Sequence, residues 1–104
     1  MPSSPDTVFG VLADPTRRRL VSMLGARGAL TATEISRELP VTRQAVVKHL
    51  SALSAAGLAS SARDGREVRY RLEAAPLNDA MAWMAGVGAD WDDRLAALER
   101  HISS

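Results

Sequence analysis

The stretch LTATEISRELPVTRQAVVKHLSALSAAGLASSARDGREVRYRL, residues 30–72, carries the signals that decide the fold. Thr31 and Glu34 have the spacing of a capping box, in which each side chain accepts a hydrogen bond from the other residue's backbone amide at a helix start. Pro40 has no amide hydrogen and disfavours helical geometry before it, so this helix is expected to run up to residue 39. Thr42 repeats the N-cap signal just beyond the proline. Two helices separated by a tight turn are therefore predicted.

A hairpin is predicted after the second helix, which Gly57 is expected to end. Residues 59–63 and 66–72 flank Asp64-Gly65, a dipeptide suited to a two-residue hairpin turn. Apolar and charged side chains alternate in the second stretch, so one hairpin face is apolar and the other is charged. Helix, turn, helix and hairpin in this order predict a winged helix-turn-helix, a mainly α fold with a small β-hairpin.

The flanking sequence predicts three further helices, giving the order four helices, two strands and a fifth helix. A short helix is expected over residues 6–13, and a second begins with Asp14 as N-cap and Pro15 as first residue. With 104 residues, 46% of them hydrophobic, the chain has material for one small core. We expect one domain over residues 1–104, made of a helix-turn-helix (31–57), a wing (58–72) and a C-terminal dimerisation helix (76–102).

The second helix of the pair has one apolar side and one side suited to a DNA groove. Val46 and Leu50 lie on the buried side, whereas Gln44 and Lys48 lie nearly opposite. Gln44 can bond to an adenine edge, and Lys48 can reach a guanine or a phosphate. For each residue alone, an ordinary solvated helix face is an equal alternative, but the set favours a recognition helix over residues 42–56. Its predicted DNA contacts are Thr42, Arg43, Gln44, Val47, Lys48 and Ser51.

The hairpin is rich in arginine, and the half of the chain that contains it is basic. Residues 1–72 hold 11 Lys and Arg against 6 Asp and Glu, giving +5, whereas residues 73–104 hold 2 against 6, giving −4. Arg66 is expected at the hairpin tip, where an extended arginine can enter a minor groove or bind phosphates. The alternative is a solvated hairpin kept soluble by its arginines. The predicted DNA contacts of the wing are Arg63, Arg66 and Arg69.

The last helix carries apolar residues spaced alternately four and three apart, interrupted at Gly88. This heptad pattern includes tryptophan-bearing turns that a small domain can hardly cover alone, so we expect a homodimer. The alternative is that the helix packs wholly on its own domain. The predicted dimer interface consists of Leu77, Met81, Trp83, Met84, Trp91, Leu95 and Leu98.

Several of these segments resemble the ArsR/SmtB family of small bacterial winged-helix repressors. The similar segments are ADPTRRR (13–19), VTRQAVVKHL (41–50) and AGL (56–58) with Gly65-Arg66. The resemblance implies a homodimer joined through its terminal helices, which binds double-stranded DNA at an inverted repeat and represses transcription until a signal releases it. Metal-sensing members use cysteines or clustered histidines that this chain lacks. The sequence therefore resembles a non-metal-sensing branch, and we predict no metal site and no cofactor.

Three other functions are alternatives to a DNA-binding repressor. A protein-binding winged helix would use the exposed Val47 and Ala55 to recognise a partner protein. A metal- or acid-responsive repressor would use His101 and nearby aspartates. An enzyme is disfavoured, because two histidines, no cysteine and scattered carboxylates assemble neither a catalytic triad nor a phosphate-binding loop. The sequence has no export pattern and no apolar run of about 20 residues, so we expect a cytoplasmic protein without membrane contact.

Overall fold

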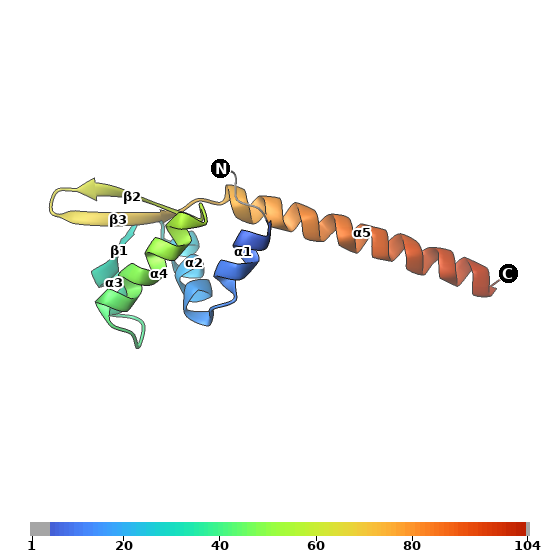
Figure 1. Cartoon of the computed structure of the whole chain (residues 1–104), viewed down its shortest axis with the longest axis horizontal. Helices are drawn as coiled ribbons and strands as arrows, with labels where there is room; N and C mark the ends of the chain where they lie inside the picture. The colour runs from blue at the N-terminus through green and yellow to red at the C-terminus, as the bar shows by residue number, and fades with distance from the viewer. Residues whose placement is uncertain (1–4, 104) are drawn as a thin grey trace.

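The computed structural model describes residues 5–103 as a winged helix-turn-helix, which confirms the predicted fold (Figure 1). Five helices and a small antiparallel sheet lie in the described part of the chain. The elements are α1 (Pro5–Leu12), α2 (Pro15–Arg27), β1 (Leu30–Thr31), α3 (Ala32–Ser36), α4 (Arg43–Ala55), β2 (Ala59–Asp64), β3 (Glu67–Leu72) and α5 (Ala75–Ser103).

The predicted N-caps are present at all three helix starts. Asp14 Oδ1 accepts bonds from the backbone amides of Arg17 and Thr16, and these bonds, that from Arg17 first, lower the pKa of Asp14. Thr31 forms the capping box, and the Thr42 hydroxyl accepts from the amide of residue 45 at 3.1 Å. The side chains thus satisfy amides that have no partner inside the helix.

Helix α3 is shorter than predicted, because it ends at Ser36 and not at Leu39. The amide of Glu38 donates to the carbonyl of Ile35, three residues back, instead of four residues back as in an α-helix. The chain therefore leaves the α-helix in a tighter turn several residues before Pro40. The tightened turn leaves Leu39 half-buried against the core. The connection to α4 is therefore longer than the sequence suggested.

The hairpin turn lies one residue later than predicted. Strands β2 and β3 pair as far as Asp64 opposite Glu67, so the two loop residues are Gly65 and Arg66. Only the first of these has a positive φ, +64° at Gly65, which is the requirement of a type II′ turn. Arg66 still lies at the tip, as expected.

A third strand, β1, was not predicted. Its two residues pair with β3, Leu30 opposite Tyr70 and Thr31 opposite Arg69, so the sheet order is β1-β3-β2. Strand β3 is therefore the central strand, and it joins the wing to the start of α3. The backbone pairing between β1 and β3 therefore holds the hairpin against the helix-turn-helix.

The core is formed by α1–α4 and the base of the sheet, and α5 contributes little to it. Of α5, only Pro76 and Ala80 are buried, and beyond them the helix extends away from the rest of the molecule (Figure 1). This projection accounts for a long axis of 69 Å. The large fully buried core side chains are Val8, Leu20, Leu24, Ile35, Val46, Leu50, Leu53 and Leu58.

Candidate DNA-binding surface

Helix α4 is divided into a buried and an exposed side as the periodicity predicted. Val46, Leu50 and Leu53 have no exposed surface, which fixes the rotation of the helix. The opposite side presents Gln44, Lys48 and Ser51 to solvent, with Val47 half-buried on the flank. A helix about 10–12 Å across with a polar free face has the dimensions of a major-groove ligand.

A cleft of about 420 Å³ lies between α3, α4 and the wing. It is bordered by the first turn of α4 on one side and by the hairpin tip on the other. Three arginines lie around it, one after the end of α3, one at the start of α4 and one in the hairpin turn, so a polyanion that follows α4 toward the wing would meet positive charge along its path. The lining residues that matter here are Arg37, Arg43, Arg66, Val47, Glu34 and Glu67.

Arg37 is a candidate site residue that the sequence did not indicate. It is the C-cap of α3 and is exposed, so its side chain lies beside the cleft. The available signal was a basic residue close to the helix-turn-helix turn, but the predicted continuation of α3 placed it in mid-helix. Arg43, which was predicted, donates from Nε to the Thr33 hydroxyl at 3.2 Å and so links α4 to α3.

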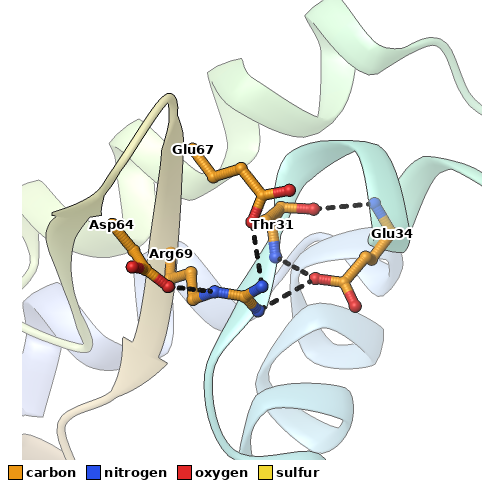
Figure 2. A network of polar contacts seen from close by, with 5 residues as sticks. All are labelled: Thr31, Glu34, Asp64, Glu67 and Arg69. Atoms are coloured by element: carbon orange, nitrogen blue, oxygen red, sulfur yellow. Dashed lines mark hydrogen bonds and ion pairs between the residues drawn. The ribbon is translucent and has the colours of Figure 1, made fainter.

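The structure separates the wing arginines that the sequence grouped together. Arg63 and Arg66 are exposed, and neither forms an ion pair within residues 5–103. Arg69 is surrounded by three carboxylates, those of Glu34, Asp64 and Glu67 (Figure 2). Its guanidinium is thus engaged inside the protein, unlike those of the other two.

The predicted interface residues of α5 are mostly uncovered. Met81, Trp83 and Trp91 have exposed fractions of 60%, 55% and 58%. Leu77 differs, because it is half-buried and packs against the core of its own chain. The Trp83 ring also has an intrachain neighbour, Phe9 of α1, with ring centroids 5.8 Å apart in a T-shaped arrangement. The other exposed apolar residues of α5 are Met84, Val87, Leu95, Leu98 and Ile102.

Two further properties concern residues 5–103 as a whole. Within that range, His, Cys, Asp and Glu side chains nowhere gather in groups of three or more that could hold a metal ion. A search of the same range for a helix both long and apolar enough to span a membrane finds none.

Comparison with known proteins agrees with this architecture. A family model described as a helix-turn-helix domain matches residues 12–61. The transcriptional repressor SdpR of Bacillus subtilis is 32% identical over 76% of this chain and 87% of its own length. An ArsR-like transcriptional regulator from Rhodococcus sp. RHA1, whose structure is solved, is 44% identical, has a TM-score of 0.80, and is matched over 92% of this chain and 90% of its own.

The chain belongs to the ArsR family of transcriptional regulators. It is accordingly a DNA-binding regulator and not an enzyme. Another family relative, the arsenic resistance transcriptional regulator ArsR1 of Pseudomonas putida, is 35% identical over 66% of this chain and 54% of its own length.

Proposed function

We propose that this ArsR-family protein is a homodimeric repressor that binds an inverted repeat through two copies of α4 and the wing. The observation that carries the proposal is the placement of the exposed side of α4 in line with the arginine-bordered cleft. In a dimer, two such surfaces about 34 Å apart would meet successive major grooves on one face of the duplex. The site of action is the cytoplasm, where the chromosome of a bacterial cell is accessible.

The roles of the DNA-contacting residues follow from their reach. Gln44 reads an adenine edge in the major groove, Lys48 reaches a guanine edge or a phosphate, and Val47 contacts a thymine methyl group. The backbone amides at the start of α4, near Thr42, are suited to a phosphate. Contacts to phosphates set the register of the protein on DNA and do not specify sequence. The phosphate-contacting set is Thr42, Arg43, Ser51, Arg63, Arg66 and, from the structure, Arg37.

The dimer is supported by the surface that the single chain leaves open. The chain exposes 7074 Å², whereas a compact protein of this mass exposes roughly 5,700 Å². The excess is larger than the roughly 800 Å² that each partner contributes to a stable interface. The uncovered area includes the apolar seam of α5, and Trp91 and Leu98 are exposed at its centre. A second copy of α5, with the same heptad spacing, is a matching occupant.

We further propose that the releasing signal is not a metal ion held by thiolates or paired histidines. The chain contains no cysteine and only two histidines, so it cannot assemble the sulfur-rich sites that soft metals prefer. Arsenic resistance belongs to the name of the Pseudomonas putida relative and is not assigned to this chain. The absence of these ligands supports the proposed assignment to a non-metal-sensing branch of the family. DNA binding unaffected by added zinc, arsenite or a chelator would support this assignment, and release by any of them would overturn it.

Selection of bound sequences from random duplex DNA tests the proposal as a whole. The expected product is an inverted repeat whose half-sites lie one helical turn apart. Its affinity should fall steeply with salt, because the basic surface displaces counterions. Recovery of no enriched sequence, or of a single half-site bound by one chain, would contradict the proposed mode of binding.

A further inference from the structure

We propose that Arg69 is a positioning residue, which holds the wing against α3 and neutralises the carboxylates beside the cleft so that Arg66 can reach DNA. The DNA-binding readout of this inference rests on the function proposed above, but its structural readout does not. The sequence predicts Arg69 as a direct DNA contact, in parallel with Arg63 and Arg66. The contacts of its guanidinium favour the positioning role.

Each nitrogen of the Arg69 guanidinium has a carboxylate partner of its own (Figure 2). Nη2 donates to Glu67 Oε2 at 2.9 Å, and Nε donates to Asp64 Oδ2 at 3.3 Å. These two acids flank the Gly65-Arg66 turn, one at the end of β2 and one at the start of β3. Arg69 therefore clamps both sides of the hairpin tip.

The third contact joins the hairpin to the helix-turn-helix. Nη1 donates to Glu34 Oε1 at 3.3 Å, and the same oxygen accepts the backbone amide of Thr31 at 2.9 Å. The Thr31 amide first, with a smaller contribution from the charge of Arg69, lowers the pKa of Glu34. Because Thr31 also lies opposite Arg69 in the sheet, one ion-pair network spans the wing, β1 and the capping box of α3.

The charges show why this arrangement matters for a polyanion. Glu34 and Glu67 line the same cleft as Arg37, Arg43 and Arg66. Without Arg69, the two acids would repel the phosphates that the three arginines attract. Arg71, two residues further along β3, is exposed and has no ion pair within residues 5–103, so it provides a matched comparison.

The test asks whether Glu67→Gln weakens or strengthens DNA binding. Glu67→Gln removes a negative charge beside the cleft, so charge repulsion alone predicts tighter DNA binding. If Glu67 serves through Arg69, the same variant loosens the wing and weakens binding, by about threefold to tenfold for a residue coupled in such a network. Asp64→Asn should act in the same direction. Glu73→Gln, an acid at the base of the hairpin outside this network, should not weaken binding.

A second measurement follows the wing itself, by hydrogen exchange of the turn and β3 amides in the full-length protein. Arg69→Gln should speed exchange at Gly65 and Arg66, whereas Arg71→Gln should leave it unchanged. The three ion pairs are all partly exposed, so each adds little to global stability and the variants should remain folded. Tighter binding by Glu67→Gln, or equal exchange in both arginine variants, would overturn the proposal. Failure of the unaltered protein to bind DNA would instead count against the proposed function, and the exchange comparison would still decide the role of Arg69.

Discussion

The body of the molecule, from α1 to β3, and its last helix differ in where their large apolar side chains lie. From α1 to β3, most large apolar side chains point inward, with Phe9 and Val68 as exceptions, and Leu20, Ile35 and Leu50 have no exposed surface. From residue 81 onward, α5 carries its large apolar side chains on the outside, with Trp91 58% exposed. The charge also changes sign, from +5 over residues 1–72 to −4 over residues 73–104.

The difference indicates that the two regions are stabilised by different partners. The body has a core of its own, so its residues account for its fold. Within residues 5–103, the outer part of α5 is covered by its own chain only where Trp83 meets Phe9, which is why we assign its apolar stripe to a second copy. The basic body and the acidic helix are then suited to different tasks, one to DNA and the other to a surface away from it.

The largest expected effect comes from placing a charge in the α5 seam. Trp91→Glu should convert a dimer into a monomer and lower affinity for the inverted repeat by about a hundredfold or more, because the second half-site then no longer binds as part of one unit. Molar mass by light scattering and a DNA titration would measure both changes. Ala97→Glu, which adds the same charge to another exposed side of α5, should leave mass and affinity nearly unchanged. If the Trp91→Glu protein were still a dimer, the apolar stripe of α5 would not be covered by a second copy, contrary to the difference drawn between the two regions.

The same leucine truncation should act differently in the two regions. Leu50→Ala removes a fully buried side chain and should cost about 2–5 kcal/mol of unfolding free energy. Urea unfolding would show this loss at every protein concentration. Leu95→Ala on α5 should reduce stability in a concentration-dependent way, through the dimer. Equal, concentration-independent losses would indicate that α5 packs on its own chain.

Substitutions on the free side of α4 should change DNA binding and leave the fold intact. Lys48→Ala should reduce the slope of log affinity against log salt by about one if the side chain contacts a phosphate. Gln44→Ala should cost about 1–3 kcal/mol of discrimination at one base pair. Titrations with the selected site and its single-base variants would measure both. Unchanged binding by both variants would remove α4 from the reading surface.

A smaller effect is expected at the capping box. Thr31→Ala removes the hydroxyl that accepts the Glu34 amide at 3.1 Å, so the start of α3 should lose about 1 kcal/mol. Urea unfolding with Thr16→Ala as the comparison variant would measure it, because the Thr16 hydroxyl forms no hydrogen bond within residues 5–103. If the unfolding free energy fell no more than in the comparison variant, the capping box would add nothing to the stability of the body.

The smallest effect concerns pH. The bond from the Thr31 amide lowers the pKa of Glu34, and that from the Arg17 amide lowers the pKa of Asp14, so both acids favour folding when ionised. Their contribution is complete above the ordinary value of 4.5 for Glu34 and is lost as pH falls through the lower folded-state pKa. Unfolding midpoints measured across that range should therefore depend less on pH in Asp14→Asn than in the unaltered protein. Asp92→Asn on α5 is the control, and equal curves for the two variants would contradict the expectation.

Local signals made most helix starts and ends predictable. Asp14, Thr31 and Thr42 cap helices through atoms two or three residues away, so their sequence neighbours suffice. Gly57 likewise ends α4 with a positive φ, and the amide of the following Leu58 bonds back to Leu53 at 2.9 Å. The buried and exposed sides of α4 followed from periodicity for the same reason.

Features that depend on distant partners were missed. Strand β1 has two residues, and it exists only because Leu30 pairs with Tyr70 far along the chain. The network around Arg69 joins residues 35 positions apart, so alternation in β3 could not distinguish Arg69 from Arg71. The position of the hairpin turn was one residue off, because Asp64-Gly65 and Gly65-Arg66 are both acceptable turn sequences and pairing across the strands decides between them.

The most direct test of the central claim is the molar mass of the unaltered protein at micromolar concentration, measured by sedimentation equilibrium without DNA. A dimer joined through α5 predicts about twice the chain mass of 11.1 kDa. A single species of 11.1 kDa across the micromolar range would contradict it, since the apolar stripe of α5 would then lack the partner that this account assigns to it.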